Sequence, residues 1–458
     1  MTAEKTAYEF ETIELNSDRL DRPVELKRIV SDVEIFEHIQ KPYLTGRILL
    51  LDDSAFYQDA DILGSERIRI KLRSLEDDAI PFTKNFFISK VEKIQKIQDN
   101  AQVIAFHIVE DIFYRSSLLN INRSYTGQPK QILKTIADNF LDKKIEYDGK
   151  SIDRAPDIQN LKCIIPNWNP LQAMQWITKR ASTSRGYPFY LYSTLVGNDL
   201  KFEDLGTILT RRSLNVDGIK HIVASTKAQD TVNVLQARRL VKNHEFGEQE
   251  DLLSLIMNGF VASDLEYIDT LTEGTKSFSF DSKNDLFKKL VQDEILYKEQ
   301  PNPPINYDEK LFDKYINEYK SVKYTKLGGS MAFRDSDEGT NPFKYDEWQN
   351  GYSESKTTAE YKLRMIRETF DKMLKKNPVT LNFDGLELIK GDFHKSIGQN
   401  IDVVFQRTQN NHEADPDDKK KSGRYLIYSV RHMFKSSVDK YDVSALCVKI
   451  GNAKRVDV

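Results

Sequence analysis

The sequence predicts a mainly β fold with α+β parts, in which two antiparallel β-barrels accompany an α+β middle domain and a largely helical or irregular insertion. Three observations predict it. Aromatic residues are plentiful, with 24 Phe and 21 Tyr, and many lie in runs with Val, Ile and Thr that favour strands. Several segments alternate polar and apolar residues with the period of a strand. One strand pattern also occurs twice, far apart in the chain.

The chain has 458 residues, enough for about three domains of roughly 150 residues each. Hydrophobic residues make up 39% and charged residues 30% of it, a balance that supports large cores. Shifts in pattern predict five segments. These are a first barrel over 1–113, a middle domain over 114–211, the start of a second barrel over 212–281, an insertion or extended arm over 282–354, and a helix with the rest of the second barrel over 355–458.

Strand signals dominate the first segment. Residues 66–73 alternate strictly, so that one face carries apolar residues and the other carries four basic ones: Ile68, Ile70 and Leu72 against Arg67, Arg69, Lys71 and Arg73. Evenly spaced cations could follow nucleic-acid phosphates. Three alternatives compete with that interpretation: a solvated outer face, an acidic neighbouring subunit, and a charged edge that blocks aggregation. The sequence favours the subunit or the solvent.

Residues 114–211 combine helix and strand signals. Pro129 stands where the first turn of a helix tolerates it, and Asn169-Pro170 is an N-cap followed by proline at the first helical position. Strand candidates 189–193 and 200–204 are joined through a Gly-Asn turn signal. This segment is therefore predicted to be a compact α+β domain.

The C-terminal half alternates between strand-rich and irregular stretches. Residues 212–281 return to strand patterns, with a short helix near 250–257. Residues 282–354 are polar and rich in proline and glycine, which favours an irregular arm. A helix is predicted over 356–375, because four apolar residues recur at helical spacing: Leu363, Ile366, Phe370 and Met373. Packing onto its own barrel is the expected role of this helix, with partner docking as the alternative.

An internal repeat links the two strand-rich parts. Residues 87–94 align without gaps to residues 426–433, and four of the eight positions are apolar in both copies. Gly64 and Gly398 each follow an aliphatic residue and lead into a strand upstream of the two copies. Val91 and Val430 are predicted to be equivalent core positions. Two copies of one barrel explain this order and spacing.

Several stretches together resemble the central hub protein of contractile-tailed phage (myovirus) baseplates, whose relatives form the hub part of type VI secretion spike proteins. The stretches that carry the resemblance are residues 44–52 with 64–66, residues 124–136, residues 163–181, residues 186–204, residues 259–263 with 268–269, and residues 425–433. Each is short and apolar, and their joint order is the specific part. The resemblance covers most of the chain outside residues 282–350.

The resemblance implies tube-like barrels and a homotrimer, in which three subunits present six similar barrels. Such a ring would adapt a six-fold tail tube or tube-initiator protein above to a separate three-fold spike protein below. It would also contact tape measure and baseplate wedge proteins. DNA would pass through an axial channel without sequence-specific binding, in a virion tail assembled in the host cytoplasm. The sequence does not decide whether the four basic residues face that channel.

No catalytic, cofactor-binding or metal-binding residue is predicted. The acid pairs Asp52-Asp53, Glu76 to Asp78 and Asp415 to Asp418 are sequence neighbours on loops, not carboxylates placed on either side of a sugar. His107 and Glu110 would point to opposite faces of a strand. His432 is expected to pack or hydrogen-bond in the last barrel, and Trp168 and Trp176 to be core residues of the middle domain.

Charge, cysteine content and hydropathy narrow the function classes further. The formal net charge is −3, without the basic excess of duplex-binding proteins. Cys163 and Cys447 lie far apart and are predicted to be buried thiols. No signal-peptide pattern or apolar run of about 20 residues occurs, so no integral membrane association is expected. A structural role is favoured, and the alternatives are a cell-wall-degrading tail enzyme and a β-rich adaptor that binds host surfaces.

Overall fold

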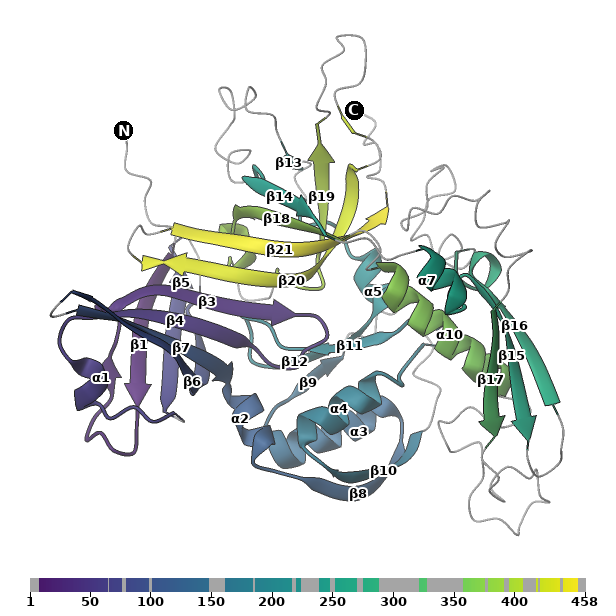
Figure 1. Cartoon of the computed structure of the whole chain (residues 1–458), viewed down its shortest axis with the longest axis horizontal. Coiled ribbons are helices and arrows are strands. Elements are labelled where there is room, and N and C mark those ends of the chain that lie inside the picture. Colours follow the sequence, from purple (N-terminus) through teal and green to yellow (C-terminus); the bar gives the residue numbers. More distant parts are fainter. Residues whose placement is uncertain are drawn as a thin grey trace.

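The computed structural model describes residues 8–451 except 65, 76–79, 99–100, 148–160, 184–185, 216–219, 224–238, 248–251, 270–274, 288–320, 328–356, 375–377, 391–394, 407–416, 419–420 and 437–439. The fold is mainly β with helical parts, as predicted. Strands from both ends of the chain lie side by side, with the middle domain beneath them and a smaller sheet to one side (Figure 1). Most of the predicted arm over 282–354 lies outside the described residues.

Seven N-terminal strands form what we call the first β region. In sheet order they are β3 (Val30–His38), β4 (Thr45–Asp52), β7 (Ala101–Glu110), β6 (Phe82–Gln98), β5 (Arg67–Ser74), β1 (Tyr8–Asn16) and β2 (Val24–Glu25). Every pairing among them is antiparallel. A short helix, α1 (Phe56–Asp59), follows β4. Ile68, Ile70 and Leu72 are buried, so the alternation predicted for β5 is confirmed.

Six later strands form the second β region. In sheet order they are β14 (Asn243–Phe246), β18 (Pro378–Asp384), β21 (Lys440–Gly451), β20 (Gly423–Lys435), β19 (Asn400–Phe405) and β13 (His221–Val223). These pairings are antiparallel except for that of β13 with β19, which is parallel. A short 3-10 helix, η6 (Leu386–Leu388), follows β18.

The two β regions share one strand order, which confirms the predicted duplication. The order β3-β4-β7-β6-β5 in the first region matches β14-β18-β21-β20-β19 in the second. The sequence repeat aligns Ile88 with Ile427, and a β-bulge follows each of them. Pairing shifts between Ile88 and Lys90 in β6 and between Ile427 and Ser429 in β20. A bulge at the same aligned position in both copies is a shared detail that strand order alone does not require.

Gly64 and Gly398 occupy related turns before equivalent strands. Both have positive φ, 101° and 72° respectively, a conformation that glycine adopts without steric cost. A Cβ on Gly64 would lie 3.9 Å from the carbonyl oxygen of Ile88. The amide of Gly398 donates to the carbonyl of Ile427 at 3.0 Å. The predicted correspondence of the two glycines is therefore confirmed.

The two β regions join edge to edge into one 13-stranded sheet. β3 pairs antiparallel with the C-terminal half of β20, from Ser429 opposite His38 to Lys435 opposite Asp32. Among the described residues the strand order does not return to its first strand. The two predicted barrels are thus curved regions of one sheet, because β20 is long enough to pair with β19 at one end and with β3 at the other.

The second copy carries a large insertion at one hairpin. Residues 39–44 join β3 to β4, whereas residues 247–377 join the equivalent strands β14 and β18. The described elements of this insertion are α7 (Leu252–Met257), β15 (Ala262–Asp269), β16 (Thr275–Asp281), η3 (Lys283–Phe287), β17 (Ser321–Leu327) and α10 (Thr357–Leu374).

The insertion contains a sheet of its own. β15 pairs with β16 and β17 and not with the second β region. The resemblance assigned residues 259–263 with 268–269 to the second barrel, and that assignment is therefore wrong. A strand pattern shows which face is buried but does not identify the strand's pairing partner.

Helix α10 confirms the helix predicted over 356–375. The ring of Phe370 lies 5.1 Å from that of Tyr187 in the middle domain. Asp371 accepts a hydrogen bond of 2.7 Å from Gln40, in the turn after β3. The helix thus packs on both the middle domain and the first β region. Ile366 and Phe370 of the predicted stripe are buried, and the side chains of Leu363 and Met373 lie outside the described residues.

The middle domain has the predicted α+β composition. Its elements are α2 (Asp111–Ser117), β8 (Ile121–Gly127), α3 (Pro129–Ile136), η1 (Ala137–Leu141), β9 (Ile145–Tyr147), β10 (Leu161–Trp168), α4 (Pro170–Thr178), β11 (Phe189–Tyr192), β12 (Leu200–Asp204) and α5 (Leu205–Thr210). Asn169 caps α4 by accepting from the Gln172 amide at 2.8 Å. β11 pairs antiparallel with β12, as the hairpin signal predicted.

Two hydrophobic cores stabilise this arrangement. The larger is shared by both β regions, α10 and the inner side of the middle domain, and the smaller lies within the middle domain. Val430 is 2% exposed in the larger core, whereas Val91 is half-buried at its margin. Because one core spans both β regions, the two regions are expected to fold as one unit.

Candidate functional site

Buried charged residues lie where the parts of the fold meet. At the junction of the two β regions, Glu37 of β3 is 1% exposed and His432 of β20 is fully buried. The Nε2 atom of His432 lies 3.0 Å from Oε2 of Glu37. Its Nδ1 atom lies 2.7 Å from the hydroxyl of Tyr441. The amide of Leu195, from the middle domain, donates to the other oxygen of Glu37. One carboxylate thus contacts three parts of the fold.

The electrostatics of Glu37 favour its charged form. Burial alone would raise its pKa, because a charge is poorly solvated in the interior. The charge of His432, its hydrogen bond and those from Ser396 and the Leu195 amide outweigh burial, so the pKa of Glu37 lies below its usual value. The prediction that His432 packs or hydrogen-bonds in the last barrel is confirmed.

A second buried cluster joins the first β region to the middle domain. Glu110, at the end of β7, accepts from the hydroxyl of Ser193 at 2.8 Å and from the Leu44 amide at 2.9 Å. The ammonium groups of Lys84 and Lys143 lie 3.6 and 3.7 Å from its other oxygen. Burial lowers the pKa of Lys84, and the charge of Glu110 opposes that effect. The two lysines come from different parts of the fold, so the cluster fixes their relative position.

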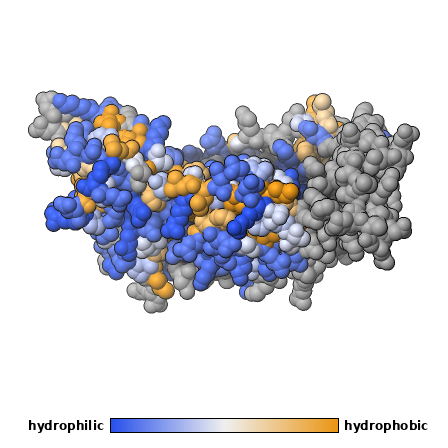
Figure 2. All heavy atoms as spheres, turned by 90° about the horizontal axis from the view of Figure 1, so that it is seen from below, coloured by the Kyte–Doolittle hydropathy of each residue, from blue (hydrophilic) through white to orange (hydrophobic). Residues whose placement is uncertain are grey.

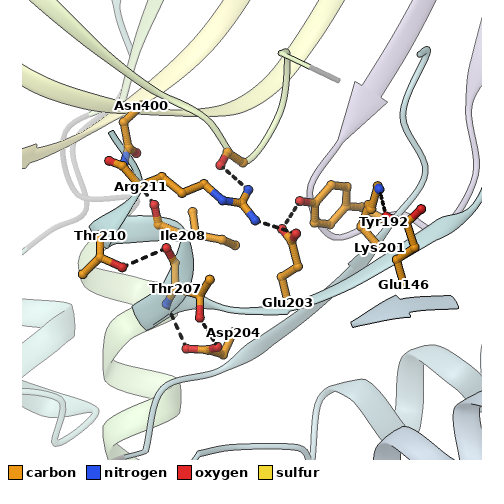
Figure 3. A network of polar contacts seen from close by, with 11 residues as sticks. Glu146, Tyr192, Lys201, Glu203, Asp204, Thr207, Ile208, Thr210, Arg211 and Asn400 are labelled. Carbon is orange, nitrogen blue, oxygen red and sulfur yellow. Dashed lines mark hydrogen bonds and ion pairs between the residues drawn. The ribbon is translucent and has the colours of Figure 1, made fainter. Parts of the chain in front are cut away.

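A third network joins the middle domain to the second β region (Figure 3). Glu203 of β12 accepts from the hydroxyl of Tyr192 and forms an ion pair of 2.5 Å with Arg211. Arg211 also donates to the carbonyl of Gly398 at 3.0 Å. Burial and the neighbouring charge of Glu203 raise the pKa of Tyr192, which stays protonated and keeps donating. The network therefore reaches the Gly398 turn, the counterpart of the Gly64 turn in the first β region.

Asn400, beside that turn, adds a further set of contacts. Its side-chain amide donates to the carbonyls of Ile208 and Arg211 at 3.0 Å each and to that of Leu209 at 3.4 Å. These carbonyls lie at the C-terminal end of α5, where a helix leaves acceptors without intrahelical partners. Asn400 thus connects β19 to the end of α5 (Figure 3).

The basic face of β5 pairs with an acidic face of the same chain. β1 lies antiparallel beside β5, with a bulge between Phe10 and Thr12. Lys71 lies 2.6 Å from Glu11, and Arg73 lies 2.7 Å from Glu9. None of the three sequence-based alternatives included this intrachain partner, because sheet neighbours cannot be deduced from one strand. The pairing neutralises much of the charge that a nucleic acid would need.

The remaining sequence candidates have structural roles. His107 hydrogen-bonds through Nδ1 to the hydroxyl of Ser89 at 2.9 Å, whereas Glu110 faces Lys84, so the two do not converge. Asp52 accepts from the amides of Phe56 and Tyr57 at 2.9 and 3.1 Å and caps the turn before α1. Glu76 to Asp78 and residues 415–416 lie outside the described residues.

The tryptophans and cysteines also belong to the packing. Trp168 and Trp176 are half-buried against the middle-domain core, 5.9 Å apart, with Arg180 3.6 Å from the centre of the Trp176 ring. The prediction that they pack in the middle domain is confirmed, at the margin of its core and not in its interior. Cys163 and Cys447 are buried and free. Burial raises the pKa of Cys163 to about 11, which keeps the thiol protonated at neutral pH.

Among the described residues, no three His, Cys, Asp or Glu side chains gather in a way that could hold a metal ion. Within the same part of the chain, no helix is both long and apolar enough to span a bilayer. The face seen from below is mostly hydrophilic, with separate apolar patches (Figure 2). Apolar atoms contribute about half or more of an ordinary protein surface, so we assign no site to that face.

Sequence reasoning missed the buried charges at the junctions. A signal was available for Glu37, because it stands in phase with the buried residues Val33 and Ile35 of β3. A carboxylate on the apolar face of an alternating strand predicts a buried partner. No comparable signal marks Glu203 or Arg211, whose partners lie in other segments of the chain.

No protein-family model matches the chain, and no curated protein matches it. Among solved structures, its fold is similar to the tail protein from Neisseria meningitidis MC58, at 10% identity and TM-score 0.49 over 96% of each chain. It is similar to the 43 kDa tail protein of prophage MuSo2 from Shewanella oneidensis, at 11% identity and TM-score 0.48 over 96% of this chain and 98% of that one. A third is an E. coli component of the type VI secretion system, at 9% identity and TM-score 0.40 over 95% and 76% of the chains.

Proposed function

We propose that this chain is a structural component of a phage tail baseplate, a trimeric central hub without enzymatic activity. Its three copies would form a ring of six similar β regions that receives a six-fold tail tube above and docks a three-fold spike below. An axial channel through that ring would let DNA pass. The protein would then reside in the virion, at the base of a contractile tail.

One observation carries the proposal: the chain holds two copies of one five-strand arrangement, joined edge to edge. A protein with two like units can present six units from three subunits, so a three-fold assembly offers pseudo-six-fold contacts. The edge-to-edge joint also shows that these units can associate through strand pairing. Strand pairing between subunits covers sheet edges that otherwise promote aggregation.

The buried charged clusters support a rigid adaptor. Glu37, Glu110 and Glu203 each connect different parts of the fold and have buried partners. Buried ion pairs of this kind favour one arrangement of the parts over others, because breaking them leaves an unpaired charge in the interior. A hub that transmits force between tube and spike requires such fixed geometry.

The proposal is tested by the mass of the purified protein in solution. Size-exclusion chromatography with light scattering is expected to give three times the 53.1 kDa of one chain, and images along the particle axis are expected to show six similar lobes. An obligate interface of this type buries well over about 2,000 Å², so the trimer should persist on dilution to micromolar concentration. A monomer at high concentration, alone and with a candidate spike, would contradict the proposal.

A further inference from the structure

Two strand edges have no partner within the described part of the chain. β14 pairs with β18 on one side only. β5 pairs with β6 only from Phe82 to Phe87, so the stretch of β6 from Lys90 to Gln98 pairs with β7 alone. Each edge presents backbone donors and acceptors that another strand can use.

The intrachain joint shows how such edges combine. By the shared strand order, β14 is the counterpart of β3 and β6 is the counterpart of β20. Within the chain, β3 pairs with the C-terminal half of β20. The counterpart of that joint is β14 against the C-terminal half of β6, and neither edge is paired by another strand among the residues that the structure describes.

We propose that β14 of one copy of this chain pairs antiparallel with the C-terminal half of β6 of a second copy, in the register of the β3–β20 joint. The number of copies that close the ring rests on the proposed function. The contact joins different surfaces of the two partners and is therefore head-to-tail, the type that generates closed rings when the rotation per subunit permits.

The register follows from the paired residues. In the first β region, the residues that lie opposite one another on β6, β7, β4 and β3 are Ile88, Ile108, Gly46 and Ile35. In the second, the residues that lie opposite one another on β20, β21, β18 and β14 are Ile427, Cys447, Val379 and Phe246. Because Ile88 and Ile427 are equivalent, Phe246 of β14 is the counterpart of Ile35 of β3.

The partner position on β6 follows in the same way. Ile104 stands four residues before Ile108, as Val443 stands four before Cys447, and they pair with Ile94 and His432 respectively. A second bulge in β6, between Val91 and Lys93, shifts the pairing by one residue relative to the gapless sequence alignment, so in the sheet Ile94 is the counterpart of His432 and not of Met433. Since Ile35 lies opposite His432 within the chain, Phe246 of one copy is expected to lie opposite Ile94 of the next.

The side chains at these two positions are suited to cover one another in such a contact. Ile94 is 48% exposed and Phe246 is 36% exposed, two large apolar side chains on open edges. An aromatic residue opposite a branched aliphatic one is a favourable cross-strand pair. The joint within the chain also holds an ion pair of 2.6 Å between Glu34 and Arg431. The counterpart positions carry Glu245 and Lys93 in the sequence, again one acid and one base.

Chemical cross-linking tests the register. Chains carrying Ile94→Cys and chains carrying Phe246→Cys, distinguished by a mass tag, are mixed, co-refolded or co-expressed, and treated with a short bismaleimide. Both native cysteines are buried. We expect covalent pairs that contain one chain of each kind, and none from either variant alone. Replacing Ile94→Cys by Ile164→Cys, at another exposed isoleucine (64% exposed), should abolish the product.

A second variant measures the contribution of the contact. Ile94→Asp is expected to weaken association by about tenfold or more, as for a residue in the covered part of an interface, with the melting temperature of the dissociated chain unchanged. Ile164→Asp serves as the matched control. A trimer in light scattering without the 94–246 cross-link would overturn the strand pairing and leave the proposed function standing. A protein that remains monomeric would overturn both.

Discussion

The contact between Glu37 and His432 should stabilise the whole sheet, and replacing His432 with leucine tests this. His432→Leu keeps an apolar side chain of similar size in β20 but leaves the carboxylate of Glu37, 1% exposed, without its partner at 3.0 Å. Leaving a buried carboxylate without its partner typically costs about 3–5 kcal/mol. The lost hydrogen bond to Tyr441 adds about 1 kcal/mol. Against a total stability of about 5–15 kcal/mol, this is a large fraction.

Urea denaturation followed by tryptophan fluorescence and far-UV circular dichroism measures the effect. Glu37→Gln is the control, because the amide retains an oxygen that can accept from the Leu195 amide while removing the charge, and we expect it to cost about 1–2 kcal/mol. In the double variant the two losses should not add, since neither side chain remains to be left unpaired. A loss below about 1 kcal/mol for His432→Leu would refute the reasoning, because a buried carboxylate would then have tolerated the loss of its partner.

Three further predictions concern the core, the middle-domain joint and pH. Val430→Asp should abolish cooperative unfolding because the charge would be fully buried. Val91→Asp, at a half-buried position, should cost only about 1–3 kcal/mol of stability. Circular dichroism melts compare the two variants. Asn400→Ala should cost about 2–3 kcal/mol, since the carbonyls at the end of α5 lose their donor, and an unchanged urea midpoint would contradict this role. The pKa of Glu37 is lower in the folded state than its ordinary value of about 4.5. The contribution of Glu37 to the free energy of unfolding is therefore present above pH 4.5 and disappears as the pH falls through the pKa of the folded state. Below pH 4.5 the stability of Glu37→Gln should accordingly fall less steeply than that of the wild type.

Local patterns carried most of the fold. The alternation in β5 showed which side chains are buried, and the Asn169-Pro170 pair located the start of α4 to the residue. The repeat was detectable because the glycine and the apolar positions recur together in the same order, and the structure adds a bulge at the same aligned position in both copies. These features depend on residues close in sequence, where steric and hydrogen-bonding preferences act directly.

Pairing between distant segments was not predictable in the same way. The strand at 262–269 has the same periodicity whether it belongs to the second β region or to a sheet of its own. The acidic residues of β1 were visible in the sequence, but their position opposite β5 depends on the order of strands in the sheet. Buried charges such as Glu203 acquire their meaning only from the partner that folding brings to them.

The insertion of residues 247–377 at a hairpin of the second copy has a consequence for how the protein can vary. The strands on either side remain paired with each other, and the entropy of closing a loop rises only slowly with its length. Material can therefore be added or exchanged there at little cost to the sheet. Helix α10, at the C-terminal end of the insertion, is different, because its contacts with Tyr187 and Gln40 hold it against the rest of the fold. The part of the insertion that precedes α10 is thus where a protein with this fold could acquire new binding specificities without a change in its main sheet.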